Sequence, residues 1–301
     1  MMINTADEKL LSCAACGKGG DGLKTCTACK MVKYCNATCQ KAHRPKHKKV
    51  CRKRAAELHD EALFKQPPPN EECPICCLLL PLDGAGQKYQ PCCGKTLCCG
   101  CIYAVLAGDD RILCPFCRTP EAASDGEAIE RLKKRVEGND AHAIHSLGSL
   151  YYDGSDCLPQ NRNKAIQLWL RAGELGCSES YNNAGNAHYH GEGVERDIKK
   201  ARYYCELAAM GGCVYARYNL GIEEGNARNM SRALKHFMIS VGAGCDDSLK
   251  AIRQCFLDGH ATKDDFEKAL RTHKEAADEM KSDQREAFES ALRDRKIVLN
   301  A

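Results

Sequence analysis

Residues 13–51 have the sequence CAACGKGGDGLKTCTACKMVKYCNATCQKAHRPKHKKVC, in which residues able to bind zinc recur at short, regular intervals. The spaced residues are Cys13, Cys16, Cys26, Cys29, Cys35, Cys39, His47 and Cys51. Zinc takes four sulfur or nitrogen ligands in a tetrahedron, so eight ligands make two closed structural sites with no open position for a catalytic water. Few large apolar side chains lie between them, so the metal has to supply the folding energy, on the order of 10–16 kcal/mol per site.

Disulfides or an iron–sulfur site are the alternatives to zinc. The chain has 301 residues and 23 cysteines. A disulfide scaffold would be secreted, but the opening MMINTADEKLLS has acids where a signal peptide needs a basic start and an apolar core. No apolar stretch reaches the roughly 18 residues of a membrane span. We therefore expect an intracellular protein, cytoplasmic or nuclear, with no membrane partner and with reduced thiols that bind metal.

The spacing of this cluster and its segments YCNATCQ and HKKVC resemble the MYND zinc finger over residues 10–54. The resemblance implies interleaved sites: Cys13, Cys16, Cys35 and Cys39 on one ion, and Cys26, Cys29, His47 and Cys51 on the other. It also implies a module that binds protein or proline-rich peptide ligands. The family usually has tryptophan between Cys39 and His47, whereas this chain has Arg44 near that position.

A second cluster follows a linker at residues 55–71, which contains the proline-rich segment Gln66 to Asn70. Its predicted ligands are Cys73, Cys76, Cys92, Cys93, Cys98, Cys101, Cys114 and Cys117. Over residues 72–120 this cluster resembles the RING finger in its first, third and last ligand pairs. Lys95 stands where the family's histidine usually lies, so Cys92 and Cys93 are predicted as the second pair. A degenerate RING with one firmly held zinc is the alternative. With two ions per finger, the chain would hold four Zn2+.

The RING resemblance also implies a docking surface for a ubiquitin-conjugating enzyme. At the corresponding positions this chain has Ile75, Pro115 and Phe116, and Arg118 stands where active members have a basic residue that holds ubiquitin. The alternative is that Ile75 and Phe116 fill the small core of the finger and that Arg118 is only solvated.

Repeats begin after a connecting helix predicted at residues 121–139. The pairs Lys164-Ala165, Lys200-Ala201, Arg232-Ala233 and Lys268-Ala269 recur at intervals of 36, 32 and 36 residues. Glycine followed by cysteine comes eleven residues after each of the first three pairs, at Gly176, Gly212 and Gly244. This pattern resembles Sel-one-like repeats, relatives of tetratricopeptide repeats, over residues 140–275. It implies a helical solenoid that binds proteins, and we expect residues 276–301 to cap it.

The predicted fold is thus two small zinc-stabilised cross-brace domains, MYND and then RING, followed by an all-α helical-repeat solenoid. No nucleophile elbow, phosphate-binding glycine loop or paired acid signature appears, so catalysis by the chain's own side chains is not expected. A RING-type ubiquitin ligase that binds a conjugating enzyme and ubiquitin ranks first. A non-catalytic adaptor is second.

A chromatin or nucleic-acid factor ranks third. The formal charge of +4 becomes about −3 once fifteen ligand thiolates and four Zn2+ are counted, so it gives no argument for nucleic acid. The basic run Lys41 to Arg54 is interpreted as the solvated face of a ligand-bearing helix. Nucleic acid is therefore not an expected partner.

Overall fold

The computed structural model describes residues 11–82, 86–106 and 113–294. The chain divides into two compact units, Met1–Lys65 and Gln66–Ala301. None of the helices in the described part of the chain combines the length and the apolar character that a bilayer crossing requires.

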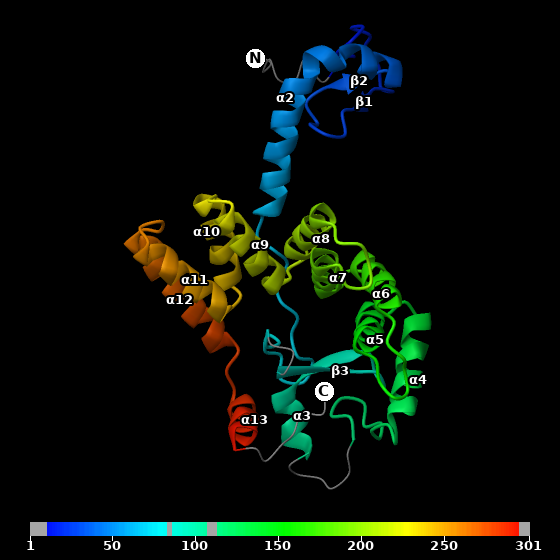
Figure 1. Ribbon diagram of the computed structural model, residues 1–301, viewed down its shortest axis with the longest axis vertical. Coiled ribbons are helices and arrows are strands. Elements are labelled where there is room, and N and C mark those ends of the chain that lie inside the picture. Colours follow the sequence, from blue (N-terminus) through cyan, green and yellow to red (C-terminus); the bar gives the residue numbers. More distant parts are fainter. Residues whose placement is uncertain (1–10, 83–85, 107–112, 295–301) are drawn as a thin grey trace. The chain divides into compact units, whose positions relative to one another are not determined.

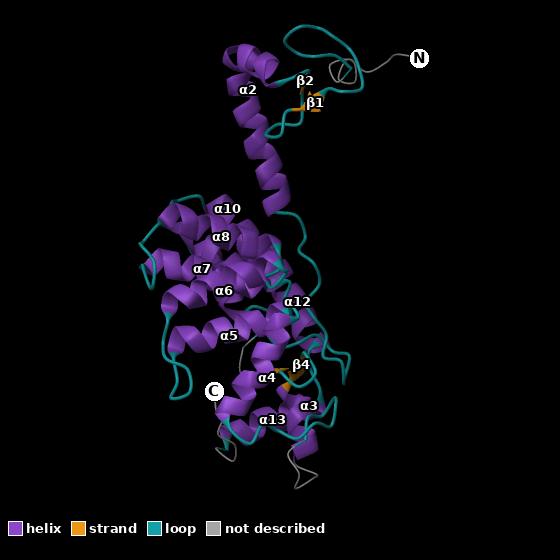
Figure 2. Ribbon diagram, turned by 90° about the vertical axis from the view of Figure 1, so that its right-hand side faces the viewer, coloured by secondary structure: helices purple, strands orange, loops and turns teal. Residues whose placement is uncertain are grey.

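The first unit is a small finger followed by one long helix. Strands β1 (Lys24–Thr25) and β2 (Lys33–Tyr34) pair antiparallel, and helix α2 runs over Ala37–Leu63. The Asn36 side chain caps the helix by accepting a hydrogen bond from the Cys39 N–H at 2.9 Å. The helix bends in its N-terminal part (Figures 1 and 2), where Pro45 removes one backbone hydrogen bond.

The first half of the linker predicted at residues 55–71 is helical, because α2 continues to Leu63. Alanine, glutamate and leucine, which favour helix, dominate residues 55–63. Non-helical chain begins just before Pro67, Pro68 and Pro69, which cannot continue a helix.

The second unit begins with a finger over residues 73–117, which we call the second finger. Strands β3 (Gln87–Gln90) and β4 (Lys95–Cys98) form an antiparallel hairpin that pairs Gln87 with Cys98. Helix α3 (Cys99–Leu106) follows directly. Cysteines make up most of its small core, which contains Cys73, Leu80, Cys98 and Cys101.

The helices after the second finger stack in antiparallel pairs (Figure 1). They are α4 (Asp125–Glu137), α5 (Ala141–Asp153), α6 (Arg162–Glu174), α7 (Ser178–His190), α8 (Ile198–Met210), α9 (Val214–Asn226), α10 (Met230–Val241), α11 (Asp246–Leu257) and α12 (Lys263–Glu279). The connecting helix predicted at residues 121–139 is α4, which shares a buried cluster with α5.

Glycines at equivalent positions allow the two helices of a repeat to come close. A Cβ on Gly148 would lie 2.7 Å from Cδ1 of Trp169, and one on Gly221 would lie 2.4 Å from Cε1 of Phe237. Real Cβ atoms do not approach other heavy atoms this closely, so glycine is required at both places. The glycines that end the second helices, such as Gly176 at φ +104°, have left-handed backbone, as the repeat pattern predicts.

The C-terminal helix does not cap the solenoid, so that expectation is wrong. Helix α13 (Asp283–Arg293) packs against α3 of the second finger instead (Figures 1 and 2), and α12 is the helix that lies against the last repeat. Arg285 and Phe288 of α13 are buried in this contact. Residues 295–301 of the predicted cap lie outside the described part of the chain.

Candidate metal centres

The predicted ligands come together in four groups. Within each group the sulfur or nitrogen atoms lie within 4.8 Å of one another. The groups are Cys13, Cys16, Cys35 and Cys39; Cys26, Cys29, His47 and Cys51; Cys73, Cys76, Cys98 and Cys101; and Cys92, Cys93, Cys114 and Cys117. Both fingers therefore have the interleaved arrangement in which the first and third pairs share one site and the second and fourth pairs share the other.

The distances within the groups fit zinc. Two sulfurs bound to one zinc at about 2.3 Å in a tetrahedron lie about 3.8 Å apart. One sulfur pair from each group has a separation close to this value: Cys16–Cys35 at 3.5 Å, Cys26–Cys51 at 3.8 Å, Cys76–Cys98 at 3.8 Å and Cys93–Cys114 at 3.9 Å. In the second group, Nε2 of His47 lies 3.2 Å from Sγ of Cys29. Four ligand atoms per group would leave a bound zinc no coordination position for a substrate, as in structural sites.

Local structure places the ligands of the first finger. The β1–β2 pairing brings Cys26 and Cys35 to the two ends of a short hairpin, and α2 carries Cys39, His47 and Cys51. His47 stacks on His43 with ring centroids 5.5 Å apart, and the hydroxyl of the buried Tyr34 lies 3.0 Å from Nδ1 of His43. These contacts fix the ring of His47 so that Nε2 faces the thiols.

Backbone amides prepare several thiols to act as thiolate ligands. Burial raises the pKa of Cys73, but hydrogen bonds from backbone N–H groups, with that of Cys98 at 3.5 Å, outweigh it and lower the pKa to about 7. Backbone N–H groups likewise outweigh burial at Cys13 and Cys26 and lower the pKa of each to about 6. Because zinc binds the thiolate form, these amides favour metal binding.

The second finger contains the unusual adjacent pair Cys92 and Cys93, and both thiols lie in one group with Cys114 and Cys117. Lys95 is exposed at the start of β4. Of the other two cysteines of this finger, Cys77 is exposed and Cys99 is buried in α3. The hairpin turn thus provides two sulfurs at the place where a histidine was missing.

Two arginines from the helical region contact the second finger, and sequence reasoning missed both. Arg135 of α4 donates to the carbonyl oxygens of Pro91 at 3.2 Å and Cys92 at 2.8 Å. Arg285 of α13 donates to the carbonyl oxygens of Leu79 and Leu78, at 2.8 and 3.5 Å, and its Nη2 lies 3.7 Å from Sγ of Cys76. Each arginine lies in a charged helix that gives no sequence signal of a distant partner.

Two further contacts join the second finger to α5 and the residue before it. The hydroxyl of Tyr89 donates to Asp140 at 2.7 Å. His142 forms an ion pair with Glu71 at 3.1 Å, and this hydrogen bond raises the pKa of His142 and lowers that of Glu71. The second finger and the repeats accordingly form one compact unit.

The predicted docking residues are on the surface. Ile75 is 41% exposed and Phe116 is 45% exposed, so neither fills the core of the finger. Pro115 is half-buried and Arg118 is exposed. The backbone of Arg118 is left-handed, at φ +61°, and its N–H donates to the Cys114 carbonyl at 2.9 Å. Among the described residues, no hydrogen bond or ion pair involves the Arg118 guanidinium.

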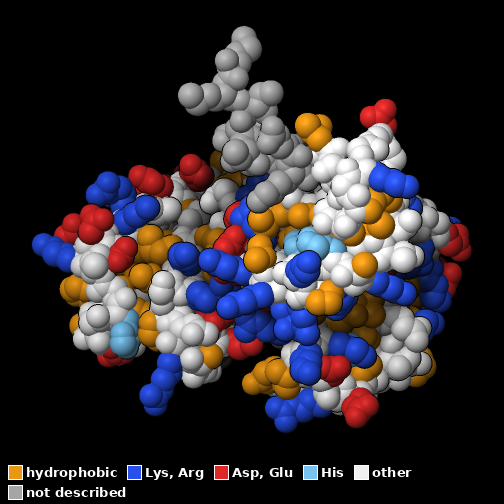
Figure 3. Space-filling model, turned by 90° about the horizontal axis from the view of Figure 1, so that it is seen from above, with side chains coloured by type: hydrophobic (Ala, Val, Ile, Leu, Met, Phe, Trp, Pro, Cys, Tyr) orange, Lys and Arg blue, Asp and Glu red, His pale blue; other side chains and the backbone are white. Residues whose placement is uncertain are grey.

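The basic residues of α2 are mostly exposed. Between residues 41 and 54, only Arg54 pairs with acids among the described residues, contacting Glu57 at 3.2 Å and Glu61 at 2.8 Å. Many Lys and Arg side chains lie on the face drawn in Figure 3.

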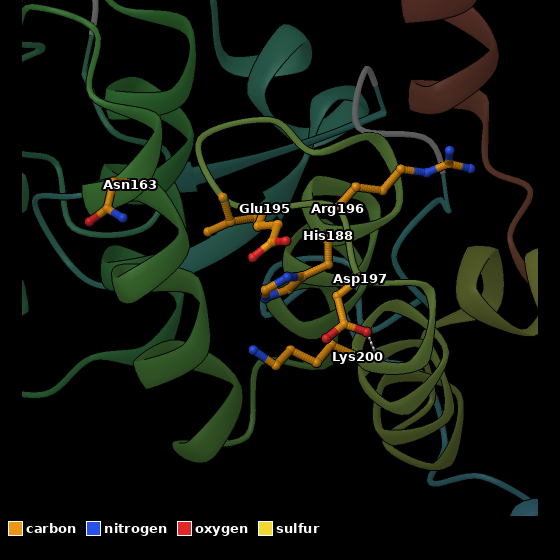
Figure 4. A pocket seen from close by; sticks show the side chains of 7 residues that line it. Asn163, His188, Glu195, Arg196, Asp197 and Lys200 are labelled. Atoms are coloured by element: carbon orange, nitrogen blue, oxygen red, sulfur yellow. Dashed lines mark hydrogen bonds between the residues drawn. The ribbon is translucent and has the colours of Figure 1, made fainter.

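The repeats contain a pocket of about 440 Å³ between α6 and the loop that precedes α8. Figure 4 shows Glu195, His188 and Lys200 facing the same space, whereas Arg196 points away from it. Charges of both signs line the pocket and partly compensate each other. The pocket therefore favours no single class of ligand.

Comparisons with known proteins match two separate parts of the chain. Residues 13–51 match the family model of the MYND finger, and residues 141–177, 178–213 and 214–237 match that of the Sel1 repeat. A curated relative is the "ERAD-associated E3 ubiquitin-protein ligase component HRD3B" of Arabidopsis thaliana, which is 27% identical over 113 residues. That match covers 37% of this chain and only 18% of the relative.

Two solved structures are also similar. A Sel1 repeat protein from Oxalobacter formigenes is 24% identical, with a TM-score of 0.47 over 60% of this chain and 70% of that one. The protective antigen c5321 of uropathogenic Escherichia coli is 25% identical, with a TM-score of 0.44 over 51% of this chain and 33% of that one. The MYND and Sel1 predictions are confirmed by the family models. The chain thus combines a zinc-binding MYND finger with Sel1 repeats in a protein-interaction scaffold.

Proposed function

We propose that the second finger is a RING that recruits a ubiquitin-conjugating enzyme, and that the MYND finger and the Sel1 repeats select the substrate. The exposure of Ile75 and Phe116 carries this proposal. Each lies in the short loop of a Cys-x2-Cys pair, and the two pairs belong to different metal groups.

The exposure of Ile75 and Phe116, which Leu106 at the end of α3 shares at 41%, contrasts with the burial of other apolar side chains of the finger. Leu97 is fully buried and Leu80 is 5% exposed, so the finger does bury large apolar residues where it can. Ile75 and Phe116 are excluded from that small core. A partner that covers them would gain roughly 25 cal/mol for each Å² of apolar surface removed from water.

Arg118 suits the second role that a RING performs. A RING supplies no covalent chemistry and instead holds the charged conjugating enzyme and its ubiquitin in a reactive geometry. The guanidinium of Arg118 is exposed next to the last ligand, Cys117, and presents a planar set of donors. It is therefore available to carbonyl or carboxylate acceptors on a partner.

The remaining modules support substrate selection. Sel1 repeats are protein-binding surfaces in the scaffold, and the curated relative is by name a component of a ubiquitin-protein ligase. The four closed metal groups offer no catalytic position, so any activity depends on what the surfaces hold together.

Ubiquitin discharge from a panel of conjugating enzymes tests the proposal. Ile75→Ala and Phe116→Ala should abolish both binding and discharge, whereas Arg118→Ala should keep binding and lower discharge at least tenfold. Leu257→Ala removes a side chain that is 64% exposed at the end of α11 and serves as the matched control. All four variants should retain wild-type zinc, because none changes a ligand. If the intact protein stimulates no enzyme of the panel, it is a non-catalytic adaptor.

A further inference from the structure

The contact between α13 and the Cys73, Cys76, Cys98 and Cys101 group joins segments about two hundred residues apart in the chain. We propose that α13 is a clasp held by zinc: the loaded site is the counter-charge of Arg285, and docking of α13 in turn retains the metal. The inference rests on zinc loading of the second finger, which the proposed function also assumes.

The burial of Arg285 is the first argument. Arg285 is only 6% exposed. Burying a guanidinium without a negative partner costs free energy, because the charge loses its water. Among the described residues, no ion pair joins Arg285 to a carboxylate. Its partners are the carbonyls of Met280, Leu79 and Leu78 and the sulfur of Cys76.

The net negative charge of the zinc-loaded site is the counter-charge that Arg285 otherwise lacks. Four thiolates around one Zn2+ carry a net charge of −2, because liganding cysteines are deprotonated. Nη2 of Arg285 lies 3.7 Å from Sγ of Cys76, within reach of a hydrogen bond to sulfur. Without the metal, the site no longer holds four thiolates together beside the buried guanidinium, which loses this concentrated negative partner.

A second side chain of α13 faces the same site. Sγ of Cys101 lies 3.4 Å from Oε1 of Gln284. A thiolate can only accept hydrogen bonds, and amide oxygen and nitrogen positions are interchangeable by rotation about χ3. In the loaded state the Gln284 amide would therefore turn and donate its Nε2–H to Cys101.

The surface of α3 is shaped for this helix. A Cβ on Gly100 would lie 2.8 Å from the backbone N of Arg285 and 2.9 Å from its Cα, so only glycine admits the backbone of α13. Farther along, Tyr103 of α3 and Phe288 of α13 have ring centroids 6.2 Å apart. Ile75 and Phe116 are exposed with α13 docked, so the clasp leaves the proposed docking residues open.

The experiment measures zinc release and helix docking on the full-length protein. A chelator with a colorimetric zinc reporter gives the release rate of each equivalent. In Arg285→Met, one equivalent should leave at least tenfold faster, and the protease Glu-C should cut after Glu286 and Glu289 at least tenfold faster. Arg293→Met, an exposed residue of the same helix, is the matched control and should behave as wild type. Fluorescence of Trp169, the single tryptophan, checks that the repeats stay folded.

Two further comparisons make the test decisive. Gly100→Ala should release the helix while keeping the charge of Arg285, which covers the case in which Arg285→Met fails to fold. Cys73→Ser should expose Glu286 and Glu289 to the protease, whereas Cys114→Ser, which removes a ligand of the neighbouring site, should leave them protected.

Wild-type zinc release and protection in both Arg285→Met and Gly100→Ala would overturn the clasp, even if ubiquitin discharge is normal. A wild-type protein that holds zinc only in the first finger would also overturn the clasp. Measuring the zinc content of the wild-type protein detects this case before any variant is made. Loss of discharge with an intact clasp would refute only the ligase.

Discussion

Gly148→Ala and Gly225→Ala test the repeat packing because the same chemical change should have opposite effects at the two positions. Both glycines lie in helices, α5 and α9, where alanine is intrinsically favoured by up to about 1 kcal/mol. At Gly225 the nearest atom to a new Cβ is that of Ala233 at 3.9 Å, which is ordinary contact. At Gly148 it would meet Cδ1 of Trp169 at 2.7 Å.

The size of the Gly148 effect follows from how tightly Trp169 is held. Carbon atoms pack at about 3.5–4.0 Å, so the indole would have to retreat by roughly 1 Å. Trp169 is 4% exposed and packs against Ala184 and Ala187, which restrict its retreat, although it also lines a pocket of about 230 Å³. Overpacking of this kind costs about 1–3 kcal/mol, which exceeds the gain in helix propensity. We expect a net loss of about 1–2 kcal/mol.

Urea unfolding followed by Trp169 fluorescence, with zinc present, measures both variants. Gly148→Ala should lower the unfolding midpoint and shift the emission of the folded state, since the new methyl touches the fluorophore. Gly225→Ala should raise the midpoint or leave it unchanged, with wild-type emission. A Gly148→Ala protein at least as stable as wild type would refute the close packing of α5 on α6.

Three further predictions concern metal content, pH and the C-terminal helix. By elemental analysis, Cys92→Ser should lose one zinc equivalent and Lys95→Ala should lose none. Full zinc content in Cys92→Ser would show that the adjacent pair does not bind zinc. Burial lowers the pKa of His236 to about 4, so the unfolded state binds its proton first as the pH falls. The free energy of unfolding should therefore fall by up to about 3 kcal/mol as the pH drops from about 6.5 to 4. Unfolding of His236→Gln, followed by Trp169 fluorescence, should lack this part of the pH dependence. A metal-free fragment of residues 124–301 should stay helical through α12 but exchange the amide hydrogens of α13 rapidly, because α3 is missing; protection of α13 in it would contradict this.

The closeness of the two cysteines within each pair was predictable from short-range geometry, whereas the interleaving of the pairs in the first finger came from the resemblance to the MYND finger. A Cys-x2-Cys loop such as Cys73 to Cys76 places two sulfurs on one ion whatever surrounds it, and four such pairs can satisfy tetrahedral zinc in few ways. Even the adjacent Cys92 and Cys93 could be chosen from the sequence, since Lys95 is a poor ligand. The repeats were predictable for a similar reason, because each one contacts mainly its neighbours and repeats the same small residues.

The sequence by itself determined the ligand sets, the MYND finger and the repeat helices, all of which follow from residues close together in the chain. Only the tertiary structure decided that α13 leaves the end of the solenoid and packs on α3, and that Arg285 and Arg135 hold the second finger. Helix α13 is mostly polar, and its few apolar residues fit any apolar surface, so local pattern cannot specify the partner. The partner is fixed by a small residue, Gly100, and a buried charge that meet only when the whole unit has folded.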